Sequence, residues 1–177
     1  TGGAEVFVEL IEKSGILEQE ATVPVVKIES PVYWSQGEIH MVALPSDVYR
    51  ISYTLDYPNN PAFKTQYRSF EITPEIFKNE IAPCRTFSLY EEVSYLMDKG
   101  LIKGGSLDNA VIIKGDVVFS KGGLHFPDEM VRHKMLDVIG DMSLVGFDFL
   151  AHIIAIRAGH ASNYAFAKKL LNTIIME

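Results

Sequence analysis

Residues 131–141 read VRHKMLDVIGD, and their polar and apolar side chains recur with the period of an α-helix. At about 100° per residue, His133, Asp137 and Asp141 follow one another along one side of the predicted helix. The opposite side collects an apolar row: Val131, Met135, Val138, Ile139 and Met142. The polar row is therefore not the core row. An imidazole and two carboxylates spaced by one turn provide the convergence that a divalent metal site needs.

The same spacing has a plainer interpretation. A histidine and an aspartate four residues apart make a weak, solvated pair on many surface helices. Spacing alone favours this surface pair, so the choice between the two interpretations depends on the sequence that surrounds the helix.

Patterns on both sides of the helix predict an α+β fold. Residues 149–156 are apolar on both faces, as in a central strand, and a further helix over 160–175 closes the chain. Four strands separated by short turns suggest an antiparallel meander, at residues 25–32, 38–44, 49–57 and 65–72. We therefore expect a two-layer α/β sandwich, with a mixed, mostly antiparallel sheet packed on two long helices.

The middle of the chain contains shorter elements. Thr73 is the predicted N-cap and Pro74 the first residue of a helix that runs to Ile81. Ser88 is the predicted cap of a second helix, which ends near Met97. Short strands are expected at residues 110–114 and 117–119. These elements fit one domain, because 177 residues are enough to bury a core without disulfides.

Composition excludes several classes of protein. The formal net charge of −7 argues against a nucleic-acid-binding surface, although a few placed cations such as Lys134 can still hold a diphosphate. The single cysteine, Cys84, excludes an internal disulfide and is expected to be a small buried hydrophobe. No apolar run is long enough for a transmembrane segment, and no signal-peptide pattern is present. A cytoplasmic protein is the simplest expectation.

Four blocks of the sequence carry a family resemblance. The first is FPDEMVRHKMLDVIGD at 126–141, and the second is AGHASN at 158–163. The other two are APCRTF at 82–87 and GLIKGGSLDNA at 100–110. In order and interval, the four blocks resemble the UDP-3-O-acyl-N-acetylglucosamine deacetylases, the zinc amidases of lipid A biosynthesis. The sequence is most similar to chlamydia-like members of that family.

The resemblance implies a role for each polar residue of the helix. His133 and Asp137 correspond to two zinc ligands of the family. His160 corresponds to the histidine that stabilises the oxyanion and protonates the leaving amine, and Asp141 to its aspartate partner. Without the resemblance, Asp141 would be a solvated surface acid and His160 a helix-entry residue.

The resemblance also implies substrate contacts. Lys134 corresponds to a lysine that contacts the substrate phosphate or the reacting region, and Thr86 and Phe87 to residues that contact the sugar and the ester. Within a βαβ insert of about residues 88–120, others correspond to the passage for the 3-O-acyl chain: Tyr90, Val93, Ile102, Gly105, Ser106, Leu107, Ala110 and Ile112. Each apolar one is equally explained as ordinary core.

The resemblance covers only the second half of the family. TGGAEVFV at 1–8 resembles the segment that follows the junction between two similar domains, and the family's Glu-His pair, its general base and third zinc ligand, occurs nowhere in the 177 residues. We do not expect His40, His125 or His152 to replace the third zinc ligand. We therefore expect a single C-terminal domain, residues 1–177, that holds two ligands of a Zn²⁺ site, lacks its N-terminal partner domain and is inactive alone.

The expected reaction of the complete enzyme is hydrolysis of the N-acetyl group of UDP-3-O-acyl-N-acetylglucosamine, which gives acetate and a free 2-amine. The alternative is a non-catalytic domain that binds an acyl chain or a nucleotide sugar, or that mediates an interaction. Loss of a partner domain should leave an apolar face exposed, through which the chain could dimerise.

Overall fold

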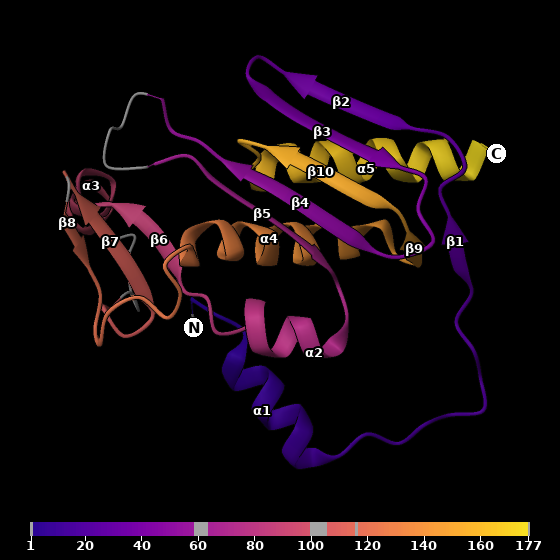
Figure 1. Ribbon diagram of the computed structural model, residues 1–177, viewed down its shortest axis with the longest axis horizontal. Helices are drawn as coiled ribbons and strands as arrows, with labels where there is room; N and C mark the ends of the chain where they lie inside the picture. The colour runs from indigo at the N-terminus through magenta and orange to yellow at the C-terminus, as the bar shows by residue number, and fades with distance from the viewer. Residues whose placement is uncertain (1, 59–63, 100–105, 116, 177) are drawn as a thin grey trace.

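A five-stranded mixed sheet lies at the centre of the protein (Figure 1). The structure is a computed structural model that describes residues 2–58, 64–99, 106–115 and 117–176. The strand order is β2-β3-β10-β4-β5. The strands are β2 (Val32–Gln36), β3 (Ile39–Leu44), β4 (Arg50–Leu55), β5 (Gln66–Glu71) and β10 (His152–Ile156).

Strand β10 occupies the middle of this sheet, as its apolar pattern predicts. It is antiparallel to β3 and parallel to β4, so it separates two hairpins, β2-β3 and β4-β5. The predicted antiparallel meander is therefore wrong. The physical reason is that Ile153 and Ala155 are fully buried and their neighbours half-buried, so β10 gains most from a strand on each edge.

Two predicted strands are each divided in the structure. Residues 25–32 become β1 (Val25–Lys27) and the start of β2, and residues 149–156 become β9 (Asp148–Leu150) and β10. Strands β1 and β9 pair in parallel as a separate two-stranded sheet. This small sheet pairs the segment before β2 with the segment before β10.

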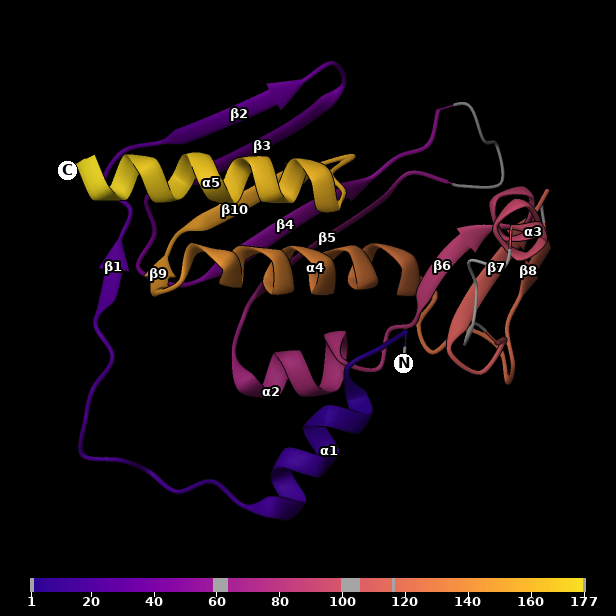
Figure 2. The same cartoon turned by 180° about the vertical axis from the view of Figure 1, so that it is seen from behind.

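Two long helices pack on one face of the five-stranded sheet, which confirms the predicted α+β sandwich. They are α4 (Glu129–Met142), extended by a 3₁₀ turn (Ser143–Val145), and α5 (His160–Met176). Figure 2 shows both helices running across the sheet. The predicted apolar row of α4 enters the core: Val131, Met135, Val138 and Met142 are buried, and Ile139 packs against them.

The polar row of α4 is shielded as well, which its helical pattern does not predict. Its second side is covered by the π-helical turn η1 (Phe77–Ile81), which continues α2 (Pro74–Ile76), and by β6 (Thr86–Leu89). Thr73 caps α2 as predicted, since its Oγ1 accepts the N–H of Ile76 at 3.1 Å. His133 is consequently only 7% exposed, although it lies away from the apolar row.

The small sheet at the left of Figure 1 has the expected βαβ order. Strands β6 and β7 (Ala110–Lys114) pair in parallel with α3 (Tyr90–Asp98) between them, and β8 (Val117–Phe119) adds an antiparallel edge. The predicted helix cap is wrong, because Ser88 lies inside β6 and its Oγ donates to Glu92 Oε2 at 3.1 Å.

The residues at the start of α1 (Glu5–Ser14) and just before it pack against the segment that precedes β6 and against the insert. The N–H groups of Ala4 and Glu5 donate to the carbonyl oxygen of Ala82 at 2.9 and 3.0 Å. Gly2 has φ +78°, and a Cβ there would lie 1.7 Å from Asn109 O, so only glycine fits this close approach. Helix α1 buries no residue and leaves four apolar side chains exposed: Val6, Phe7, Leu10 and Ile11.

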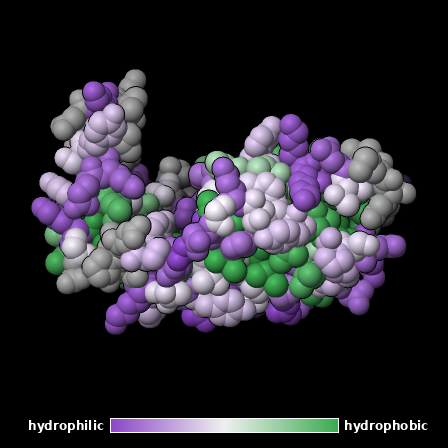
Figure 3. Space-filling model, turned by 90° about the horizontal axis from the view of Figure 1, so that it is seen from above, coloured by the Kyte–Doolittle hydropathy of each residue, from purple (hydrophilic) through white to green (hydrophobic). Residues whose placement is uncertain are grey.

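Apolar residues reach the surface elsewhere too. Figure 3, which views the molecule from above Figure 1, shows apolar areas between polar side chains. Exposed apolar atoms of this kind are common on folded proteins, so they do not by themselves mark an interface. Among the described residues, no helix is both long and apolar enough to cross a membrane.

Tyr53 fixes the loop that leads into α5. Its side chain is 1% exposed, and its hydroxyl donates to the carbonyl oxygen of Ala158, two residues before α5 begins. Replacing Tyr53 with phenylalanine leaves that buried carbonyl without this donor, so we expect the free energy of unfolding to fall by about 1–3 kcal/mol. Tyr164→Phe, at a 58% exposed position, should change it by less than about 0.5 kcal/mol. Urea denaturation of both variants checks this, and equal effects would contradict it.

Candidate metal and acid–base site

His133 and Asp137 lie one turn apart on α4 and face each other. His133 Nε2 is 3.4 Å from Asp137 Oδ1, while His133 Nδ1 is 3.1 Å from the carbonyl oxygen of Cys84. A carbonyl oxygen only accepts, so Nδ1 must carry the proton in this contact. Burial lowers the pKa of His133, although the Asp137 carboxylate acts in the opposite direction. The neutral ring therefore turns a free lone pair on Nε2 toward Asp137.

This pair has the donor atoms and the separation that zinc requires. Ligand atoms about 2.0–2.2 Å from a tetrahedral zinc lie roughly 3.4 Å from each other. A neutral imidazole whose other nitrogen donates to a carbonyl is also the usual form of a histidine ligand. No group of three His, Cys, Asp or Glu side chains that could hold a metal occurs among the described residues. Among the described residues, His133 and Asp137 are therefore a pair of candidate ligands.

His160 is the first residue of α5, and it contacts α4 at Asp141, one turn beyond Asp137. Its Nδ1 lies 2.8 Å from Asp141 Oδ2, and its Nε2 lies 3.9 Å from Asp137 Oδ1. The His160 side chain is 71% exposed, whereas that of Asp141 is 21% exposed. The packing of α5 on α4 therefore brings His133, Asp137, Asp141 and His160 into one polar cluster with an accessible imidazole.

Three further predicted residues border this cluster. Lys134 Nζ lies 2.9 Å from Asp137 Oδ2 and 5.5 Å from the centre of the Phe87 ring. Phe87 in turn meets the His133 ring edge-on, with centroids 6.4 Å apart. Thr86 and His133 both line an apolar groove of about 500 Å³, together with Phe7 of the N-terminal helix. The candidate ligand His133 thus lies at the edge of an open groove.

Part of the predicted acyl passage gathers around a second pocket, of about 280 Å³, in the insert. Its lining consists of Tyr90, Val93, Leu107, Ile112, Lys114 and Phe119. Ser106 and Ala110 are not in this lining, and they are joined by a backbone hydrogen bond of 3.0 Å. Ile102 and Gly105 lie outside the described residues. The pocket is mainly apolar, with one cation, Lys114, among its walls.

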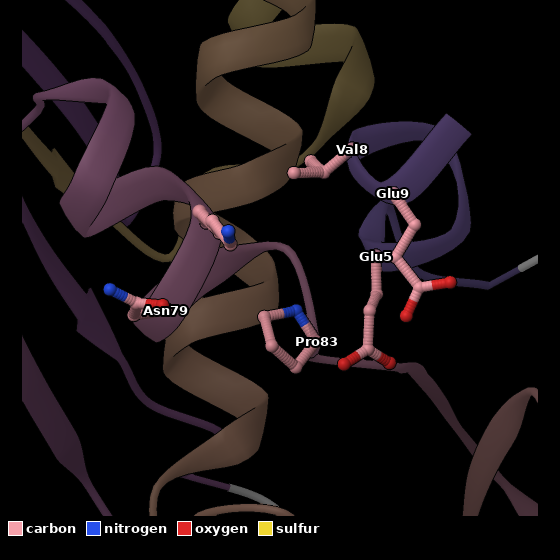
Figure 4. Close-up of a pocket in the computed structure, with 6 residues that line it drawn as sticks. Glu5, Val8, Glu9, Asn79 and Pro83 are labelled. Atoms are coloured by element: carbon pink, nitrogen blue, oxygen red, sulfur yellow. The ribbon is translucent and has the colours of Figure 1, made fainter. Parts of the chain in front are cut away.

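The other three histidines make hydrogen bonds outside the cluster. His40 contacts the Tyr33 hydroxyl at 3.1 Å, His152 the Ser52 hydroxyl at 2.8 Å, and His125 the carbonyl oxygen of Pro83 at 2.7 Å. None of them joins the cluster on α4. A pocket of about 260 Å³ between α1 and η1 is lined by Glu5, Val8, Glu9, Lys78, Asn79 and Pro83 (Figure 4). It contains no residue that the sequence predicts for the site.

Cys84 is fully buried, as predicted. Its thiol donates to the carbonyl oxygen of Glu80 at 3.4 Å, and burial raises its pKa to about 12. A thiol with so high a pKa holds little thiolate at neutral pH. Cys84 therefore contributes to the site through its carbonyl group rather than its sulfur.

Three residues in or beside the site have no role predicted from the sequence. Asn163, which is 1% exposed, donates from Nδ2 to Asp141 Oδ2 at 2.8 Å, so His160 and Asn163 share one carboxylate oxygen. Their spacing of three residues on one helix is the signal that could have identified Asn163. The other two are Arg85 and Glu129, a buried ion pair beside His133.

An α+β sandwich with one His-Asp pair on α4 and a neighbouring one between α4 and α5 has the donor groups of a metal-assisted hydrolase. Residues 1–172 match the family LpxC, UDP-3-O-acyl N-acetylglycosamine deacetylase. The chain belongs to this family.

Curated relatives agree with this assignment. The UDP-3-O-acyl-N-acetylglucosamine deacetylases of Chlamydia felis and Chlamydia pneumoniae are each 54% identical to the chain over 173 residues, which is 98% of the chain and 62% and 61% of the relatives. That of Chlamydia muridarum is 53% identical over 176 residues, 99% of the chain and 62% of the relative. The chain therefore spans about six tenths of the length of these relatives.

Proposed function

We propose that this chain forms part of the active site of a zinc-dependent deacetylase of lipid A biosynthesis. Its substrate would be UDP-3-O-acyl-N-acetylglucosamine, and its products acetate and the free 2-amine. The names of the relatives support the substrate and the reaction. The observation that carries the proposal is the convergence of His133 and Asp137 with His160 across two helices.

His133 and Asp137 would hold the zinc, through Nε2 and Oδ1. Each has its remaining polar atom engaged, His133 Nδ1 by Cys84 O and Asp137 Oδ2 by Lys134 Nζ, so both ligand atoms keep a fixed direction. A catalytic zinc supplies a water with a pKa of about 7 and a polarised carbonyl. The third ligand and a general base would come from an N-terminal partner domain outside this chain.

His160 would act as the general acid. Its Nδ1 proton is held by Asp141, so its Nε2 is the nitrogen that can carry and release a second proton. Protonated Nε2 would donate a hydrogen bond to the oxyanion of the tetrahedral intermediate. It would then give its proton to the amide nitrogen as the C–N bond breaks. The exposure of His160 leaves room for the acetamido group.

Lys134 and the insert would bind the rest of the substrate. The Lys134 ammonium lies between Asp137 and the Phe87 ring, where it can attract substrate oxygens that carry negative charge. Tyr90, Val93 and Ile112 line the apolar pocket of the insert, which suits a fatty acyl chain. Thr86 and Phe87 on β6 lie beside the proposed ligand His133, where they would contact the sugar and the ester.

Zinc binding tests the proposal in a complete protein. We consider a chimera in which this chain replaces the matching 173 residues of the Chlamydia felis relative. The chimera should bind one zinc ion per molecule, and His133→Ala should lower the affinity at least 100-fold, because one ligand is lost. His40→Ala, which removes a histidine on the far side of the sheet, should leave the affinity unchanged. Calorimetric titration with zinc measures all three proteins.

Two results would contradict the zinc site. A folded chimera that binds no zinc would favour the alternative, a non-catalytic domain that uses its apolar pocket to bind an acyl chain. Equal zinc affinity in the chimera and its His133→Ala variant would place the metal elsewhere.

A further inference from the structure

Arg85 and Glu129 form a fully bonded ion pair in the interior. The side chains are 5% and 0% exposed. Glu129 Oε1 accepts from the Arg85 backbone N–H and Nε, both at 2.9 Å. Oε2 accepts from Arg85 Nη2 at 3.1 Å and from the backbone N–H of His125 at 2.7 Å. Arg85 also donates to the carbonyl oxygens of Lys121 and Gly123, at 3.1 and 2.6 Å.

This pair joins the two segments that meet at His133. Glu129 lies on α4, one turn before His133, and Arg85 directly follows Cys84, whose carbonyl oxygen contacts His133 Nδ1. Because Glu129 holds both the backbone N–H and the guanidinium of Arg85, the peptide group between Cys84 and Arg85 is fixed relative to α4. The direction of the Cys84 carbonyl is therefore set by the ion pair.

The tautomer of His133 depends on that direction. Cys84 O, at 3.1 Å from Nδ1, favours the ring with its proton on Nδ1. Asp137 Oδ1, at 3.4 Å from Nε2, favours the opposite tautomer, in which Nε2 donates to the carboxylate. Only the first tautomer leaves Nε2 free to bind a metal. A displaced Cys84 carbonyl would hand the proton to Nε2 and block the ligand.

We propose that Arg85 and Glu129 are positioning residues, which hold the Cys84 carbonyl on His133 Nδ1 and so keep His133 in the tautomer that binds metal. This inference rests on the proposed metal-binding role of His133. The tautomer of His133, however, is a property of the metal-free ring and can be measured without zinc.

The tautomer can be read directly from the nitrogen chemical shifts of the His133 ring in the ¹⁵N-labelled, metal-free chain at neutral pH. The wild-type chain should show mainly the form protonated at Nδ1. Glu129→Gln keeps the shape of the side chain but replaces one oxygen by an NH₂ group that cannot accept from Arg85. The ratio of the Nδ1–H form to the Nε2–H form should then fall about five- to tenfold, as expected for the loss of one well-placed hydrogen bond.

Asp128→Asn is the matched control. Asp128 precedes Glu129 in the sequence and also forms ion pairs, but with Arg68 and Arg132 instead of Arg85. It accepts a hydrogen bond from Arg132 Nε at 2.8 Å. The substitution therefore removes one carboxylate charge at the N-terminus of α4 without removing a hydrogen bond to Arg85 or to the Cys84 carbonyl. The tautomer ratio of His133 should stay at the wild-type value. An unchanged ratio in Glu129→Gln, or the same fall in Asp128→Asn, would overturn the proposal.

A second variant distinguishes an effect on folding stability from an effect on the position of the Cys84 carbonyl. If Glu129→Gln does not fold, the double variant Arg85→Met, Glu129→Met removes both charges and leaves no unpaired ion in the interior. It should show the same loss of the Nδ1–H form, and a wild-type ratio in this folded variant would equally overturn the proposal.

Zinc affinity of the chimera gives the independent readout. Glu129→Gln should lower it about 10- to 100-fold, the usual effect of removing a group that orients a ligand. A wild-type chimera that binds no zinc would refute the proposed function alone, because the tautomer measurement on the metal-free chain still decides the positioning role.

Discussion

Glu129→Ala is expected to lower the free energy of unfolding by about 3–5 kcal/mol. The substitution leaves the Arg85 guanidinium buried, at 5% exposure, without its carboxylate partner. It also removes the acceptor for the backbone N–H groups of Arg85 and His125. An uncompensated charge in the interior costs far more than the pair contributes, so the loss should be several times that of an average substitution. Urea denaturation followed by circular dichroism measures it.

Glu12→Ala provides the comparison for Glu129→Ala. It breaks an ion pair of 2.6 Å between Glu12 and Lys78, whose side chains are each 48% exposed. Such a half-exposed pair is worth about 0–1 kcal/mol. If both substitutions cost the same, burial does not govern the energetics of the Arg85-Glu129 pair.

The effect of Glu129→Ala should also depend on pH. Burial by itself would raise the pKa of Glu129, but hydrogen bonds from Arg85 and His125 outweigh it and hold the pKa below its usual value. A depressed folded-state pKa contributes stability above the unfolded-state value, near about pH 4.3. That contribution is lost as the pH falls through the folded-state pKa. The difference in stability between wild type and Glu129→Ala should therefore be constant near neutral pH and shrink in acid.

His160→Gln is expected to lower kcat of the chimera for acetate release by about 10²–10⁴-fold. Glutamine can still donate a hydrogen bond to Asp141, but it has no proton to transfer to the leaving amine. The substitution lies on the exposed start of α5, so folding and zinc content should be retained. A fall in kcat with little change in KM would identify an interaction made in the transition state.

His40→Gln is the control for general-acid catalysis. His40 stacks on Tyr33 on the sheet, away from α4, and should leave kcat unchanged. If His160→Gln retained full kcat, His160 would not be the acid, and another group would have to protonate the amine.

Much of the fold follows from local patterns. The apolar row of α4 and the two-sided apolar character of β10 predict a buried helix and a central strand, and both occur. The position of β10 between β3 and β4 could not be predicted in the same way. Turn residues indicate which strands are neighbours in sequence, whereas β10 pairs with strands about a hundred residues earlier in the chain, such as Ser52 opposite Ile154.

The sequence predicted the polar residues of the candidate site but not their burial or the ion pair beside them. Helical spacing places His133, Asp137 and Asp141 on one face of α4, and the family resemblance adds His160. The covering of that face by η1 and β6 depends on tertiary packing, so its burial was missed. Arg85 and Glu129 are 44 residues apart and join the segment before β6 to α4, so neither residue carries a local signal of the pair.

Acetate release by the chimera shows whether this chain supplies a ligand of a catalytic zinc. We expect the chimera to release acetate from UDP-3-O-acyl-N-acetylglucosamine, and we expect His133→Ala to abolish both this release and zinc binding while the protein stays folded. Acetate release by the His133→Ala chimera at the rate of the unsubstituted chimera would contradict the claim that this chain supplies a ligand of the catalytic zinc.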